Sequence, residues 1–122
     1  MANDFKRFTV ASVNTSTGAS ASAVYTVPAG AGSSALESIV IGITLANKTS
    51  CGVTASVFLD YFSGSNDVNI VKEATIPAGS SLEVMSGNKL VLQNTGSAAD
   101  VLRVSASAAN SADALVSVLE DV

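Results

Sequence analysis

The stretch LESIVIGITL, residues 36–45, decides the fold class because large apolar side chains recur at every second position along it. That spacing predicts a half-buried β-strand, since successive side chains of a strand point to opposite faces. The side chains that share the predicted buried face are Ile39, Ile41, Ile43 and Leu45. We expect a change of Ile41 to Asp, in the middle of this face, to abolish folding.

A second alternating run, residues 53–61, follows the turn-like residues 47–52. The apolar face of this run consists of Val53, Ala55, Val57, Leu59 and Tyr61. Two such runs joined by a short polar turn predict an antiparallel hairpin. Phe58 falls on the polar face of the second run, which predicts that another element or another subunit covers it.

Seven further strand-like runs occur at short intervals: residues 5–13, 20–27, 67–75, 82–85, 89–92, 101–106 and 114–120. Clusters of Gly, Pro, Asn and Ser separate them, as expected of turns. We therefore predict an all-β chain in which residues 1–122 form a single β-sandwich domain of eight or nine antiparallel strands. A jelly-roll and an immunoglobulin-like topology both fit this pattern.

The composition argues against several kinds of partner. The net charge is -4 and no run of Lys or Arg is present, so we expect no nucleic-acid binding. The apolar stretches are strand-sized, well short of the roughly 20 residues of a membrane span, so we expect no membrane partner. Asp4, Lys6 and Arg7 argue against a signal peptide, and the single cysteine, Cys51, fits a chain made in a reducing cytoplasm.

The chain offers little chemistry for catalysis. It contains no His, which removes the usual Ser-His-Asp and Cys-His arrangements, so we predict that it is not an enzyme. Cys51 has no orienting base that would activate its thiol. The oxygen-rich residues 60–69 lack the ligand spacing of an EF-hand, and we predict no metal and no cofactor. Solvated surface positions are expected for the carboxylates of Asp60, Asp67, Glu73, Glu83, Glu120 and Asp121.

The chain carries more apolar surface than a small monomer is expected to hide. Hydrophobic residues make up 48% of it and charged residues only 13%, and the mean hydropathy is +0.44. Residues 101–104 and 115–119 are apolar on both predicted strand faces, more than the core of one sandwich is expected to bury. We therefore predict a homo-oligomer or a larger particle.

Several segments carry a resemblance to a known group of proteins: ITLANKTS…VTASVFLD, ATIPAGSSLEVMSGNKLVLQNTGSAADVLRVSASA and the ending ALVSVLEDV. Their order of an IPAGSSLE turn, a KLVL strand, a GSAADVLRV step and a final SVLE strand resembles the short β-sandwich virion accessory proteins of tailed bacteriophages. The resemblance covers residues 36–122. No catalytic residue is part of it.

The resemblance implies a non-enzymatic structural protein that is made in the host cytoplasm and located in the virion. Its first form is a capsid decoration (cement) protein, a trimer that binds the major capsid protein on the assembled head and stabilises it. The alternative is a tail or fibre accessory module that contacts a host receptor or glycan through loops such as residues 61–67. A small hydrolase or lectin-like module is the least favoured class, because the chain lacks His.

Residues 1–10 lie outside the matched segments and form either an N-terminal arm or the first strand of the sandwich. Phe5, Lys6, Arg7 and Phe8 combine two aromatic with two basic side chains in this stretch. Because chain termini are free to become ordered on binding, these four residues are the candidate arm for contact with the particle or with a neighbouring subunit.

Overall fold

The computed structural model describes residues 3–16, 18–61, 67–85 and 89–121. Each of the nine strand-like runs in the sequence overlaps one strand of the described chain. The elements in chain order are β1 (Asn3–Val10), the 3-10 turn η1 (Gly18–Ser20), β2 (Ser22–Thr26), β3 (Leu36–Asn47), β4 (Val53–Asp60), β5 (Asp67–Ile76), β6 (Ser81–Glu83), β7 (Leu90–Asn94), β8 (Val101–Ala106) and β9 (Ala112–Asp121).

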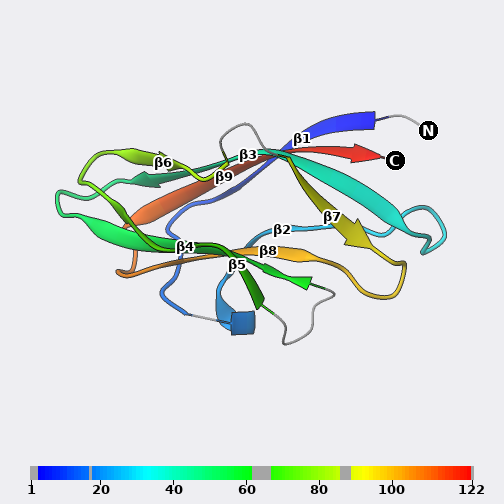
Figure 1. The fold of residues 1–122 in the computed structure, drawn as a ribbon, viewed down its shortest axis with the longest axis horizontal. Coiled ribbons are helices and arrows are strands. Elements are labelled where there is room, and N and C mark those ends of the chain that lie inside the picture. The colour runs from blue at the N-terminus through cyan, green and yellow to red at the C-terminus, as the bar shows by residue number, and fades with distance from the viewer. Residues whose placement is uncertain (1–2, 17, 62–66, 86–88, 122) are drawn as a thin grey trace.

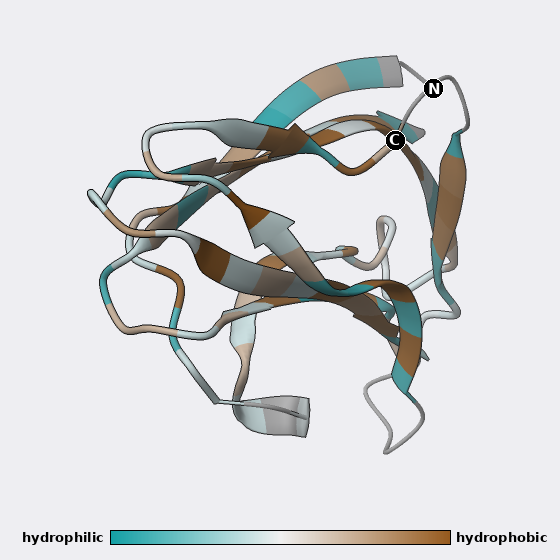
Figure 2. Ribbon diagram, turned by 60° about the vertical axis from the view of Figure 1, so that its left-hand side comes forward, coloured by the Kyte–Doolittle hydropathy of each residue, from teal (hydrophilic) through white to brown (hydrophobic). Residues whose placement is uncertain are grey.

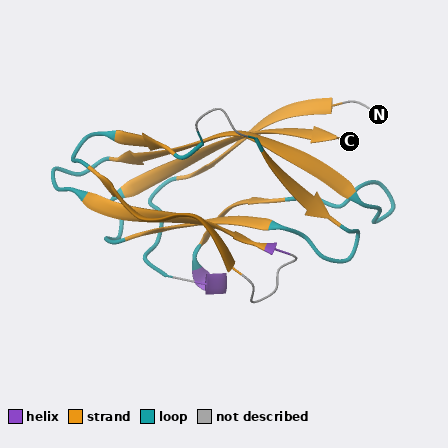
Figure 3. Cartoon of the chain, viewed as in Figure 1, coloured by secondary structure: helices purple, strands orange, loops and turns teal. Residues whose placement is uncertain are grey.

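The strands form two antiparallel sheets that pack face to face, so the predicted all-β sandwich is confirmed (Figure 1; Figure 3). Sheet A has the order β1-β9-β3-β6, and β7 pairs with the other half of β3. Sheet B has the order β2-β8-β4-β5. Strands thus pair from the two ends of the chain inward, first with last and second with next to last. This strand order is that of a jelly roll. Of the two topologies left open by the sequence, the structure therefore has the jelly roll and not the immunoglobulin-like one.

The predicted hairpin between residues 36–45 and 53–61 is wrong, because β3 belongs to sheet A and β4 to sheet B. The segment between them crosses from one sheet to the other, over a separation of about 10 Å in a sandwich. The side-chain amide of Asn47 holds this crossing in place by donating hydrogen bonds to the carbonyls of Cys51, Ile76 and Pro77 at 2.8, 3.0 and 3.2 Å.

The core lies between the sheets and is filled by the inward-facing residues of both. Figure 2 shows apolar and polar residues alternating along the strands, as one buried and one solvated face require. Sheet A contributes mainly Val40, Ile43, Leu45, Val116 and Val118, and sheet B contributes mainly Tyr25, Ala55, Val57, Leu102 and Val104.

The predicted burial of Ile41 is also wrong. Val40 pairs with Val118 and Gly42 with Ser117, so Ile41 is an extra residue, a β-bulge, between two regular pairs of β3 and β9. Because of the extra residue, the side chains that face the core are the even-numbered ones before the bulge and the odd-numbered ones after it. Val40 and Ile43 are buried, at 0% and 1% exposure, whereas the side chain of Ile41 is 42% exposed.

Phe58 is covered within the chain, which confirms the first of the two explanations offered for it. It is 5% exposed and lies opposite Arg103 of β8 on the outer face of sheet B. Arg103 donates hydrogen bonds to the carboxylate of Asp60 at 3.1 Å and to the carbonyl of Ala21 at 3.0 Å. The segment before β2 is therefore held over this face of the sheet.

Candidate functional site

The four residues of the candidate arm lie in β1, an edge strand of sheet A that pairs with β9 over its whole length. Alternation along the strand divides them into two pairs. Phe8 packs in the sandwich, with its ring centroid 4.7 Å from that of Tyr25, and Lys6 shares that inner side. Phe5 and Arg7 project from the outer side, where Phe5 is 78% exposed. The four side chains therefore do not act on one surface.

On the inner side, Lys6 takes part in a polar network that joins the two sheets. Its ammonium group lies 2.9 Å from Oε1 of Glu120, whose side chain is only 2% exposed. The Tyr25 hydroxyl of sheet B donates to Oε2 of Glu120 at 2.6 Å. The same hydroxyl lies 2.6 Å from Oγ of Ser38, which must donate because the tyrosine proton is already used. Both oxygens of Glu120 thus have partners.

This network shifts the pKa of two of its members. Hydrogen bonding and charge attraction to Glu120 raise the pKa of Lys6 above its usual value of 10.5. Burial is the main cause that raises the pKa of the Tyr25 phenol, and its hydrogen bond to Glu120 adds to the effect. The lysine is therefore held in its charged form and the tyrosine in its neutral form.

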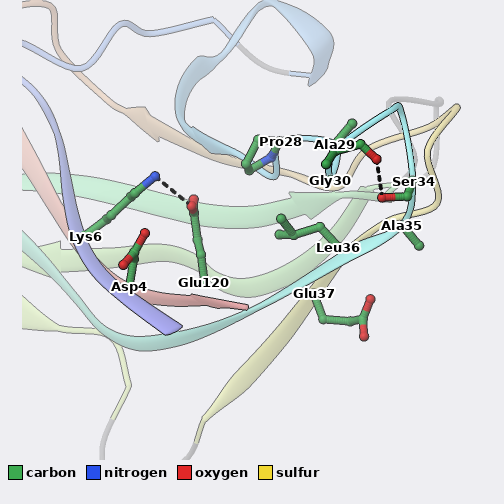
Figure 4. A pocket seen from close by; sticks show the side chains of 11 residues that line it. Asp4, Lys6, Pro28, Ala29, Gly30, Ser34, Ala35, Leu36, Glu37 and Glu120 are labelled. Atoms are coloured by element: carbon green, nitrogen blue, oxygen red, sulfur yellow. Dashed lines mark hydrogen bonds and ion pairs between the residues drawn. The ribbon is translucent and has the colours of Figure 1, made fainter. Parts of the chain in front are cut away.

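A hollow of about 530 Å³ lies beside this network, at the end of the sandwich where β1 and β9 meet the segment after β2 (Figure 4). Lys6 and Glu120 point toward one another across its wall, and the turn with Pro28, Gly30 and Ser34 closes the opposite side. The charges that line it neutralise each other or, as with Asp4, are exposed to solvent. The hydrogen bond from Tyr25 to Glu120 joins the two sheets, and the ion pair between Lys6 and Glu120 joins β1 to β9 within sheet A.

The pKa shift of Lys6 predicts a pH-dependent contribution to stability. Because the pKa of Lys6 is higher in the folded than in the unfolded chain, its ion pair contributes fully to stability below the unfolded-state pKa of 10.5. That contribution is lost as the pH rises through the folded-state pKa of Lys6. We expect Lys6→Met to lower the free energy of unfolding at about pH 8, with a smaller difference from the original chain at about pH 11.5. Urea denaturation at the two pH values measures this. Arg7→Met, on the other side of β1, is the matched control. If the stability difference between Lys6→Met and the original chain were the same at both pH values, the charged pair of Lys6 with Glu120 would not be its cause.

The outer face of sheet A carries a continuous line of apolar side chains. The strand register places Phe5 opposite Leu119, Leu119 opposite Ile39, and Ile39 opposite Val91. We call these four residues the apolar row. It crosses four neighbouring strands, β1, β9, β3 and β7. Val91 is 57% exposed, so both ends of the row are open to solvent.

Further apolar surface lies on the same face. Ile41 projects from the bulge beside the row, and Leu115 is 38% exposed farther along β9. A shallow hollow of about 340 Å³ next to Leu115 is lined mainly by small side chains, among them Thr9, Thr44 and Ala46. The outer face of sheet A is therefore the most extended exposed apolar surface in the described part of the chain, and it is the candidate interaction surface.

The other candidates from the sequence are dispersed. Cys51 is exposed in the crossing between β3 and β4, where its backbone carbonyl accepts a hydrogen bond from the side-chain amide of Asn47. Within residues 60–69, Asp60 is buried and paired with Arg103, whereas Asp67 is exposed; residues 62–66 lie outside the described residues. No cluster of three metal-ligating side chains occurs in the described part of the chain.

Two carboxylates expected on the surface are buried, which corrects the sequence analysis. Glu120 and Asp60 are each 1% exposed, and each is paired with a basic side chain. The alternation of the sequence could have predicted the burial of Glu120, since this residue shares the inner side of β9 with Val116 and Val118. The exposed apolar face of sheet A could also be expected from the sequence, because β9 carries apolar residues on both of its faces.

Comparison of the chain with models of known protein families, with curated proteins and with solved structures finds no match. Among the described residues, no helix has the length and apolar character needed to cross a membrane. The geometry defines the class of the protein, a jelly-roll β-sandwich with one exposed apolar sheet face.

Proposed function

We propose that this chain is a non-enzymatic structural protein of a bacteriophage virion, and that its specific role is capsid decoration. In this role it binds the major capsid protein on the outside of the assembled head and stabilises the particle. The observation that carries the proposal is the exposed apolar face of sheet A, because a contiguous exposed apolar patch is typical of a surface for protein assembly.

The form of that surface supports an assembly role. The apolar row runs across four neighbouring strands of one sheet, so it offers a broad face rather than an enclosed cleft for a small substrate. The polar network of Lys6, Glu120 and Tyr25 joins the two sheets at one end of the sandwich. A module whose two sheets are joined by such a network and that exposes an apolar face is suited to reinforcing a particle.

The jelly-roll fold is compatible with the proposal without selecting it. Such sandwiches occur in viral capsid domains and also in lectins and cupins, and a fold by itself does not determine function. The choice of a virion role rests on the apolar face together with the resemblance over residues 36–122.

The second candidate is a tail or fibre accessory module that contacts a host receptor or glycan. Tyr61, at the end of β4, is 37% exposed, and Val68 at the start of β5 is 50% exposed. Aromatic side chains of this kind can stack on a sugar ring. This candidate would place the binding surface on sheet B rather than on sheet A.

The copy number of the chain in virions tests both candidates. In purified virions of a phage that encodes the chain, we expect quantitative mass spectrometry to find a copy number comparable with that of the major capsid protein. Heads that lack the chain should rupture at a lower temperature, and addition of the purified chain should restore their stability. A far smaller copy number would favour the tail or fibre, and absence from virions would contradict both candidates.

A further inference from the structure

We propose that two copies of this chain pair face to face through the outer face of sheet A, with a twofold axis that runs along the apolar row. The partner of this surface is thus a second copy of the chain. The inference concerns the same face that supports the proposed function and names a second copy as its occupant, so the pair is expected in solution and the face meets the capsid only when a pair separates on the head.

The first argument is the distribution of exposed apolar side chains. Six large hydrophobic side chains in the described part of the chain are exposed, and four of them lie on this face: Phe5, Ile41, Val91 and Leu115. Leu119 and Ile39 are half-buried and fill the middle of the apolar row. Such a surface is costly to leave in water and favours association.

The second argument is the charge on either side of the apolar row. On one side, two residues along the strands, the register places Glu37 opposite Gln93. On the other side, Arg7 lies opposite Ser117, and the exposed Lys89 directly precedes β7, two residues before Val91. Within two residues of the row, Glu37 therefore lies on one side and Arg7 and Lys89 on the other, while the exposed Glu83 lies farther from the row, opposite Thr44 of β3.

A twofold rotation about the row brings these two sides together. The rotation turns the second copy over, places its apolar row on the first, and exchanges the side of Glu37 with the side of Arg7 and Lys89. Glu37 of one copy then faces β3 of the other copy. Lys89 lies one strand away, at the start of β7, and a lysine side chain can span this lateral offset of about 4.8 Å. Because the pairing is symmetric, the contact forms twice. A rotation about the strand direction would instead set like charges against each other.

The third argument is the size of the face. β1, β9 and β3 pair over roughly 27 Å and β7 pairs with β3 over only roughly 17 Å, which at a strand spacing of about 4.8 Å provides about 470 Å² of plane, and projecting side chains raise the accessible area above that value. A stable interface buries about 800 Å² of accessible surface on each partner. The small residues Ser117 and Gly42 next to the row allow close approach, since no atom lies within 4 Å of the position that a Cβ would take at Gly42.

The oligomeric state of the purified chain tests the pairing. We expect light scattering and sedimentation equilibrium to give twice the mass of one chain. The double variant Phe5→Ser/Val91→Ser should raise the dissociation constant by about a hundredfold or more while its circular dichroism spectrum stays unchanged. Val68→Ser is the matched control, because Val68 is comparably exposed on sheet B, and it should pair normally.

Charge exchange tests the orientation. Glu37→Lys alone and Lys89→Glu alone should each weaken the pair by about tenfold at low salt, because each sets like charges opposite each other. The double variant Glu37→Lys/Lys89→Glu should restore the original affinity. A monomer or a trimer, an equal loss of pairing in Val68→Ser, or no restoration in the double exchange would overturn the proposal. Absence of the chain from virions would instead contradict only the proposed function.

Discussion

Replacing Ile43 with Asp is expected to unfold the chain, whereas the same replacement two residues earlier, at Ile41, is expected to leave the fold intact. Both residues belong to the alternating run that identifies β3, but the bulge places them on opposite sides of the sheet. Ile43 is 1% exposed in the core, and Ile41 is 42% exposed on the outer face. The structure thus moves the critical position of this strand from Ile41 to Ile43.

The magnitudes separate the two variants. An unpaired carboxylate at Ile43 would cost several kcal/mol, and loss of the buried side chain would add about 2–5 kcal/mol, against a total stability of about 5–15 kcal/mol. At Ile41 the carboxylate stays hydrated, so we expect a cost of about 1 kcal/mol or less. Urea denaturation followed by circular dichroism distinguishes the outcomes. Ile43→Val should remain folded with a loss of about 1 kcal/mol, and an unfolded Ile41→Asp would show that Ile41 is buried in the core.

Replacing Arg103 with Met is expected to destabilise the chain by about 3–5 kcal/mol, because it leaves a buried carboxylate without its counter-ion. The side chains of Arg103 and Asp60 are 15% and 2% exposed, and their ion pair measures 3.1 Å. The same substitution also removes the hydrogen bond from Arg103 to the carbonyl of Ala21. Thermal and urea denaturation measure the loss.

A double variant shows whether the isolated charge causes this loss. In Asp60→Leu/Arg103→Met neither charge is buried, and we expect most of the lost stability to return. Lys48→Met is the matched control for removing a cation. Lys48 and Asp113 form an exposed pair at 2.9 Å, whose hydrogen bond lowers the pKa of Asp113, and exposed pairs contribute only about 0–1 kcal/mol. An equally unstable double variant would indicate that packing of the arginine stem, rather than charge, is responsible.

The positions of the strands could be predicted from the sequence, because alternation and turn residues act over a few neighbouring positions. The partners of the strands could not, since alternation along β3 does not distinguish β4 from β9 as its neighbour. The bulge was hidden for a similar reason. Ile39, Val40 and Ile41 are all apolar, so either face of this stretch could be the buried one, and pairing with β9 selects Val40.

The candidate site was predicted only in part. Phe5 belongs to the candidate arm that the sequence predicts, and it lies at one end of the apolar row. The other members come from strands far apart in the sequence, and only the sheet register aligns them. Glu120 was assigned to the surface because it lies close to the C-terminus, yet the central position of β9 in sheet A buries it. Proximity to a terminus is therefore a poor guide to exposure when the terminal strand is not at a sheet edge.

The central position of β9 also determines the order in which the chain can fold. β4 and β5 are neighbours in sequence and pair directly, so this hairpin can form early during synthesis. β1 and β3, by contrast, are joined in sheet A only through β9, and the strand edges that β9 pairs with remain unpaired until residues 112–121 have been made. Closing contacts over such long stretches of chain is slow. Sheet A is therefore expected to be the last part of the molecule to form, with its apolar strands exposed to chaperones and to aggregation until then.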